Sequence, residues 1–192
     1  MEESIKQELI AKMKSINTLL QEVNDVLGCD EPELKIPSEL KLRFPRGYIR
    51  PASTFRSRLT CMKDLTHKYN ISYQLMLSDL FTWLLNRTDI ALTIREMIIK
   101  YEIVLMASVA ETLKDVFASE RLSFPKGLLR LLSSKKISPN TFSEANWLWN
   151  TRVAIHPFEL NQIEHKKYDD AQFDRAVFAV RNMLKELNTT CP

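Results

Sequence analysis

Arg152 and His156, near the C-terminal end of the chain, carry side chains that together could act on a phosphate ester. They are four residues apart in the stretch WLWNTRVAIHPFE, so in a helix they share one face, about one turn from each other. Arginine can bind phosphate through two parallel hydrogen bonds, and histidine can take or give a proton near pH 7. The pair therefore indicates phosphate chemistry, although both residue types are also favoured at the last turn of a helix by its free carbonyl groups.

The helix that carries this pair is predicted to begin at Ser138, because Ser138 is a good N-cap and Pro139 is well tolerated at the first helical position. Thr141 and Glu144 have the spacing of a capping box and strengthen this start. Pro157 ends the helix. After a polar connector, Asp169 or Asp170 is predicted to cap a final helix, whose apolar residues keep heptad spacing at Phe173, Val177, Val180, Leu184 and Leu187.

Apolar residues at helical spacing predict five further helices upstream of this region. Their expected ranges are 2–27, about 53–70, 72 to about 85, about 94–117 and 128–132. Asn70 is expected to close the second helix and Ser72 to cap the third. The fourth helix is expected to be central, with a stripe formed by Ile94, Ile98, Tyr101, Leu105, Val109, Leu113 and Val116.

The composition also favours helices over strands. The chain of 192 residues contains three glycines, far below the average usage of roughly 7%. Few glycines allow few tight hairpin turns, and no alternating strand pattern is visible. We therefore predict an all-α protein, an antiparallel helical bundle in one domain. Its expected parts are an N-terminal amphipathic helix at 1–29, a proline-rich basic connector at 30–52 and the bundle itself at 53–192.

Cysteine usage and hydropathy point to a cytoplasmic protein without a metal site or cofactor. Cys29, Cys61 and Cys191 are odd in number and far apart, and they form no CxxC or Cys/His cluster. We therefore expect them to be reduced. The charged, amphipathic N-terminus is not a signal peptide, and no segment reaches the ~18 consecutive apolar residues of a membrane span.

A basic segment lies in the connector and in the helix that follows it. Between residues 41 and 68 it holds eight lysines and arginines and one acid, Asp64. Contact with a phosphate backbone is one interpretation, with interleaved Phe44, Tyr48 and Phe55 available to stack on unpaired bases. The other is that these cations pair with acids elsewhere in the chain. The residues assigned to RNA binding are Arg43, Arg46, Arg50, Arg56 and Arg58.

The second half of the chain resembles the HEPN family (higher eukaryote and prokaryote nucleotide-binding). HEPN proteins are helical bundles in which an Arg and a His at the end of a late helix precede a polar connector and a closing amphipathic helix. The resemblance covers roughly residues 72–187 and includes Ala110 and Glu111 in a helix similar to the central family helix. The residues that carry it are Trp149, Arg152, Ile155, His156 and Pro157, followed by Tyr168, Asp169, Phe173, Ala176, Val180, Met183, Leu184 and Leu187.

The resemblance implies a metal-independent endoribonuclease of the toxin or antiviral-defence type, acting on RNA as a homodimer whose partners include an antitoxin or regulatory protein. Arg152 would bind the scissile phosphate, and His156 would transfer a proton as the ribose 2′-hydroxyl attacks. The family usually has a polar residue, often Asn, directly after this Arg. Four to six residues usually stand between this Arg and the His. Here Val153 stands in that position and three residues intervene, with Asn150 a candidate substitute for the missing amide.

Two further expectations follow from these residues. Glu111 is a candidate to orient Arg152 or His156, or else a partly exposed surface glutamate. The competing function is a catalytically degenerate HEPN-like module that binds RNA, a nucleotide or a protein partner, and a third reading is a helical scaffold with no role in nucleic-acid binding. In that last case Arg56 and Arg58 would be engaged in intramolecular pairs.

Overall fold

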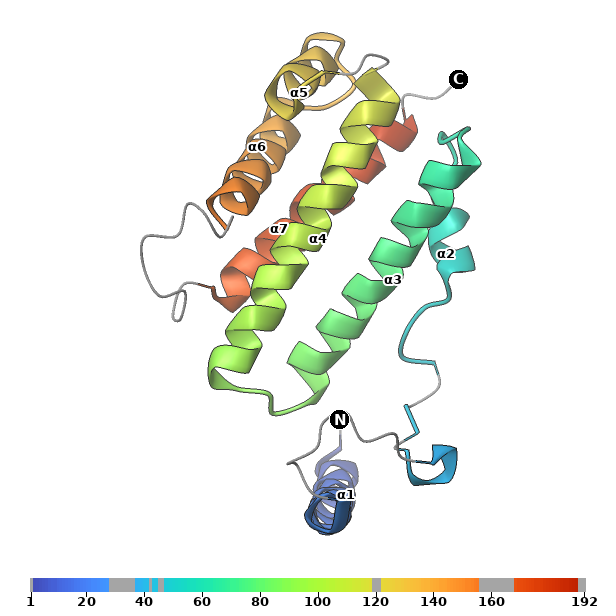
Figure 1. The fold of residues 1–192 in the computed structure, drawn as a ribbon, viewed down its shortest axis with the longest axis vertical. Coiled ribbons are helices and arrows are strands. Elements are labelled where there is room, and N and C mark those ends of the chain that lie inside the picture. Colours follow the sequence, from blue (N-terminus) through green and yellow to red (C-terminus); the bar gives the residue numbers. More distant parts are fainter. Residues whose placement is uncertain are drawn as a thin grey trace. The chain divides into compact units, whose positions relative to one another are not determined.

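A computed structural model of the chain describes residues 2–27, 37–41, 43–44, 47–118, 122–155 and 168–189. Within these ranges every regular element is helical, which confirms the predicted all-α class (Figure 1). Contacts divide the chain into two units, residues 1–44 and residues 45–192. The helices are α1 (Glu3–Leu27), α2 (Ala52–Arg56), α3 (Leu65–Arg87), α4 (Leu92–Ala118), α5 (Phe124–Ser133), α6 (Pro139–Ala154) and α7 (Asp170–Thr189), with one short 3-10 helix at Ser38–Leu40.

The first unit contains α1, an amphipathic helix of 25 residues. Its bounds agree with the predicted range 2–27. None of its residues is buried, and the exposed apolar side chains include Leu9, Met13, Ile16 and Val23. The sequence pattern therefore predicted this helix correctly from its period alone.

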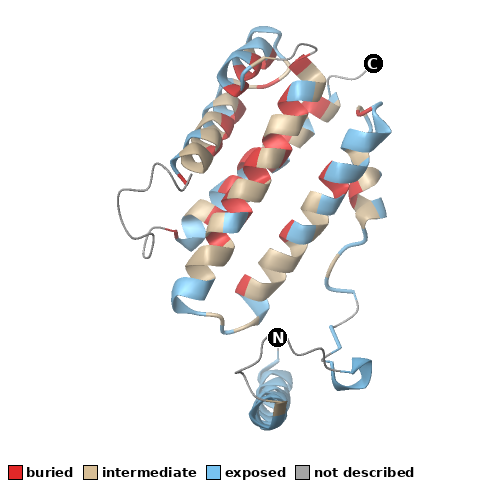
Figure 2. Ribbon diagram, in the orientation of Figure 1, coloured by how far each residue is buried: buried red, intermediate tan, exposed pale blue. Residues whose placement is uncertain are grey.

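The second unit is a bundle built around α4. This helix packs against α3, α5, α6 and α7, and a short turn joins it to the antiparallel α3 (Figure 1). Figure 2 shows buried positions along α4 after its first two turns, from Ile99 to Ala118. They include Ile99, Ile103, Met106, Val109 and Leu113, each at most 1% exposed. Since helices cover α4 on several sides, its buried face is broad.

The apolar stripe expected on α4 was partly wrong. Val109 and Leu113 are buried, but Ile94 and Tyr101 are 66% and 58% exposed. The buried face instead includes Glu102 and Ile103. The buried face is turned by about one residue position, roughly 100°, from the predicted stripe, because the neighbouring helices decide which side of α4 is covered.

The helix boundaries expected around Asn70 were also wrong. The helix α2 ends at Arg56, and α3 runs without interruption through Asn70 and Ser72. The N-cap of α3 is Asp64, whose carboxylate accepts a hydrogen bond from the backbone N–H of His67 at 2.9 Å. Ser72 is buried inside the helix and its hydroxyl donates to the carbonyl of Tyr69 at 2.7 Å. A serine that looks like a cap can thus be satisfied by its own helix.

The predicted starts of the last two helices are confirmed. Ser138 caps α6 by accepting a hydrogen bond from the backbone N–H of Thr141 at 3.2 Å, with Pro139 at the first helical position. Asp169 caps α7 by accepting from the backbone N–H of Gln172 at 2.9 Å, and its own N–H donates to the Gln172 side chain at 3.1 Å. The predicted end of α6 was wrong: the helix ends at Ala154, with Ile155 as its C-cap, before the end expected at Pro157.

A lysine is buried where α4 meets α5. The side chain of Lys114 is 3% exposed, and its ammonium group donates to the Asp115 carboxylate and, at 2.7 Å, to the carbonyl of Leu122. Gly127 of α5 lies against the aliphatic part of this side chain, because a Cβ at position 127 would be 2.2 Å from Lys114 Cδ. The glycine therefore allows the close approach of α5 to α4.

Cys61 lies in the turn between α2 and α3, and it is disulfide-bonded. This differs from the reduced state expected from the number and spacing of the cysteines. None of the described helices is long and apolar enough to cross a membrane.

Candidate functional site

Arg152 lies in the last turn of α6 and is half-buried. The carbon atom of its guanidinium group is 5.0 Å from the centre of the Trp149 ring. That ring in turn stacks on Phe124 of α5, with 4.4 Å between the ring centres and 9° between the planes. Among the described residues no carboxylate pairs with Arg152. The stacked rings therefore hold a cation in place at the end of the helix that leads to His156.

Two of the predicted site residues, His156 and Arg46, lie outside the described residues, so the Arg152–His156 pair stays a prediction. The supporting residues are described. Asn150 is exposed on α6 and Glu111 is half-buried on α4. Neither forms a hydrogen bond with Arg152 in the described part of the chain. Asn150 precedes Arg152 by two residues, which places the two side chains on different faces of α6.

The predicted RNA-binding arginines have different surroundings. Arg50 forms a bidentate ion pair with Asp79 of α3, at 2.5 Å and 2.8 Å, and its guanidinium carbon is 4.7 Å from the Phe55 ring centre. Arg56 stacks on Tyr69 at 4.4 Å. Arg43, in the first unit, and Arg58 are exposed. Arg50 is thus a structural residue, whereas Arg58 has no carboxylate partner among the described residues.

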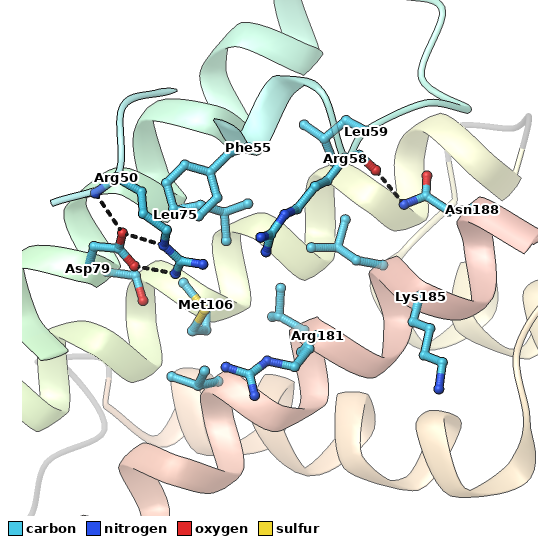
Figure 3. A pocket seen from close by; sticks show the side chains of 14 residues that line it. Arg50, Phe55, Arg58, Leu59, Leu75, Asp79, Met106, Arg181, Lys185 and Asn188 are labelled. Carbon is cyan, nitrogen blue, oxygen red and sulfur yellow. Dashed lines mark hydrogen bonds and ion pairs between the residues drawn. The ribbon is translucent and has the colours of Figure 1, made fainter. Parts of the chain in front are cut away.

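Arg58 lines a cavity of about 470 Å³ between α7 on one side and α2 and α3 on the other, with Met106 of α4 contributing to its lining. We call this cavity the cationic groove (Figure 3). Four cations and one carboxylate line it, giving a net charge of +3: Arg50, Arg58, Arg181 and Lys185 against Asp79. Its main apolar lining residues are Phe55, Leu59, Leu75, Met106, Val177, Val180 and Leu184.

Sequence reasoning missed the contribution of α7 to this groove. Arg181 and Lys185 are four residues apart and share one face of α7, next to the apolar residues that were interpreted as core. Two cations one turn apart, with no acid at the intervening turn, are a visible signal. The pairing of Arg50 with Asp79 had no such signal because 29 residues separate the two.

Glu102 of α4 is a fully buried carboxyl group close to the groove. It accepts a hydrogen bond from the hydroxyl of Ser78, a residue that lines the groove, at 2.5 Å. Its other carboxyl oxygen has no hydrogen-bond partner among the described residues. Burial raises the pKa of Glu102 to about 7; the Ser78 hydrogen bond opposes this and the nearby charge of Asp79 adds to it.

Glu186 of α7 connects the end of that helix to the start of α6. It accepts hydrogen bonds from the Ser138 backbone N–H at 2.7 Å and from the hydroxyls of Ser138 and Thr141, both at 2.8 Å. Partial burial would raise the pKa of Glu186, but these hydrogen bonds and the charge of Lys185 outweigh it, so the pKa is lowered. Farther along, Glu144 of α6 pairs with Arg175 of α7 at 2.7 Å.

No protein-family model, curated protein or solved structure matches the chain. Within the ranges that the structure describes, no group of three or more His, Cys, Asp or Glu side chains is placed to hold a metal ion.

Proposed function

We propose that this chain is a HEPN-like, metal-independent endoribonuclease in which Arg152 and His156 act on the scissile phosphate of RNA. The observation that carries the proposal is the state of Arg152: it is stacked on Trp149 and has no acid partner in the described part of the chain. A structural arginine at a helix end is usually paired or solvated. An unpaired one held on an aromatic ring is available for a phosphate.

In this proposal Arg152 binds the phosphate through its guanidinium fork and neutralises the charge that develops on it. The ribose 2′-oxygen attacks the phosphorus while His156 takes part in proton transfer. The 2′-hydroxyl loses its proton, the bond from phosphorus to the 5′-oxygen breaks and that oxygen takes up a proton, leaving a 2′,3′-cyclic phosphate and a free 5′-hydroxyl. This reaction needs the 2′-hydroxyl, so it is specific for RNA. As in HEPN proteins, two copies of the pair from a homodimer would share one cleft.

The experiment measures cleavage of end-labelled single-stranded RNA in the presence of a chelator. We expect the natural chain to cleave it and His156→Ala to lower the rate by about 100-fold or more. Arg152→Lys should also lower the rate, because lysine keeps the charge and loses the bidentate geometry. The matched control is Lys126→Gln, which removes an exposed cation from α5. Its rate should equal that of the natural chain.

A substrate control separates this mechanism from contaminating activity. An RNA with a single 2′-deoxy nucleotide at the cleaved position should resist the enzyme, since no 2′-hydroxyl is present to attack. If the natural chain cleaves no RNA, either with chelator or with added Mg²⁺, the ribonuclease proposal is rejected.

A second candidate is a non-catalytic HEPN-like module that binds RNA, a nucleotide or a regulatory protein. It is favoured by Val153, which replaces the usual polar residue after the Arg, and by Asn150, which forms no hydrogen bond with Arg152 in the described part of the chain. For such a module, His156→Ala would change binding and leave no turnover to lose. Binding of the uncleaved RNA, measured by fluorescence anisotropy, would distinguish the two functions.

A further inference from the structure

The cationic groove contains chemistry that the proposed ribonuclease does not use. Figure 3 shows the guanidinium groups of Arg50, Arg58 and Arg181 extending into the space between the helices. Arg50 is neutralised by Asp79, but Arg58, Arg181 and Lys185 have no carboxylate partner among the described residues. Like charges around one cavity repel one another, and a bound anion would relieve that repulsion. The charge distribution therefore points to an anionic ligand.

The side-chain groups of the groove that could accept a hydrogen bond are either engaged within the protein or buried. Both carboxylate oxygens of Asp79 accept from Arg50. The Asn188 side-chain oxygen accepts from the Thr60 hydroxyl at 3.5 Å, and Ser78, whose hydroxyl donates to Glu102, is 8% exposed. The polar groups that remain are cationic donors. A ligand that must itself donate hydrogen bonds, as a nucleobase does, finds little to accept them.

The apolar lining of the groove is mostly aliphatic. Leu75, Val177 and Leu184 are half-exposed, while Met106 and Val180 are buried beneath them. The one aromatic ring, Phe55, is 5% exposed and lies under the Arg50 guanidinium. The lining thus offers no open aromatic face for a base, but it offers an apolar surface to a hydrocarbon chain.

We infer that the cationic groove binds a small amphipathic anion, with an aliphatic chain against Leu75, Val177 and Leu184 and a carboxylate or phosphate group held by Arg58 and Arg181. The Lys185 side chain points away from these two arginines and adds positive charge at the edge of the groove (Figure 3). The cavity volume of about 470 Å³ lies in the range of small-molecule sites. Arg152 does not line this cavity, so the inference does not depend on ribonuclease activity.

The test is calorimetric titration of the full chain with decanoate and with decyl phosphate, both kept below their micelle concentrations. We expect both to bind. Affinity should rise about fourfold for each methylene added between hexanoate and decanoate, until the cavity is filled. Three control ligands separate the contributions. Decanol has the hydrocarbon chain without the charge, and inorganic phosphate has the charge without the hydrocarbon chain. Adenosine monophosphate has a base in place of the hydrocarbon chain. All three should bind at least about tenfold more weakly.

Two substitutions assign the binding to this groove. Arg181→Gln should weaken decanoate binding about tenfold, because it removes one charge-assisted contact, and Lys126→Gln on α5 should leave it unchanged. Arg181 is exposed, so its substitution leaves the fold intact, as circular dichroism would verify. Leu184→Trp, which fills the groove, should weaken decanoate more than phosphate.

Several outcomes would overturn the inference. One is that inorganic phosphate or adenosine monophosphate binds as tightly as decyl phosphate, which would mean that the apolar lining plays no part. Another is an affinity that does not depend on chain length. The absence of binding by either decyl probe at millimolar concentration, or an equal effect of Arg181→Gln and Lys126→Gln, would also reject it.

Discussion

Glu102 makes the stability of the second unit depend on pH in an unusual direction. It is fully buried, and its pKa rises from 4.5 to about 7 in the folded chain, mainly because burial disfavours the charged form. Between these two values the unfolded chain has released its proton and the folded chain still holds it. The free energy of unfolding therefore falls as the pH rises through this window. The size of the effect is about 3 kcal/mol, at about 1.4 kcal/mol per pKa unit.

Glu102→Gln removes this titration while keeping an oxygen that can accept the Ser78 hydrogen bond. We expect the difference in unfolding free energy between Glu102→Gln and the natural chain to change by about 3 kcal/mol between about pH 5 and about pH 8, with the variant gaining at the higher pH. Urea unfolding followed by tryptophan fluorescence measures it. All three tryptophans, Trp83, Trp147 and Trp149, belong to the second unit, so the signal reports on that unit alone.

Ser78→Ala provides an independent check of the cause. It removes the one hydrogen bond that lowers the pKa of Glu102, so the loss of stability with rising pH should become larger. The reasoning would be refuted by a difference between Glu102→Gln and the natural chain that stays constant over this pH range. It would equally be refuted if the variant were the less stable protein at high pH by a growing margin.

Three other outcomes are expected. Glu186→Gln should lower the unfolding free energy by about 1–2 kcal/mol at neutral pH; since the pKa of Glu186 is lowered by folding, this loss should shrink as the pH falls through the folded value. Gly127→Ala should destabilise by about 1–3 kcal/mol in urea unfolding, although alanine is the better helix former, because the added Cβ would collide with Lys114. Dithiothreitol should lower the melting temperature of the natural chain and leave that of Cys61→Ser unchanged.

The sequence predicted the elements that depend on local chemistry. The caps at Ser138 and Asp169 are correct because a cap is a contact between residues three apart. The helix boundary expected at Asn70 and Ser72 was wrong although the interactions there are also local. Asp64 caps α3, and the Ser72 hydroxyl bonds to its own helix. The sequence pattern does not tell which of Asp64 and Ser72 is the cap. Tyr101 is exposed because of how the neighbouring helices pack against α4, which no local sequence pattern indicates.

Only those parts of the candidate sites that lie within a single helix were predictable from the sequence. The sequence predicted that Arg152 lies on the helix that begins after Ser138, but it placed the end of that helix at Pro157 and not at Ala154. The support of Arg152 on Trp149 and Phe124 was not predicted, because Phe124 belongs to another helix and reaches Trp149 only through tertiary packing. The cationic groove likewise joins Arg58 to Arg181, which are 123 positions apart in the sequence.

The attachment of α6 to α7 restricts which changes in chain length the protein can accept. Glu186 fixes the first turn of α6, and Arg175 fixes Glu144 one turn later. Arg152 lies about 21 Å from Ser138 along the helix axis, at about 1.5 Å per residue. A one-residue insertion after Glu144 would turn everything beyond it by about 100° and move Trp149 away from Phe124. The residue type at exposed positions in this part of α6 can therefore vary, but the number of residues between Glu144 and Trp149 must stay the same.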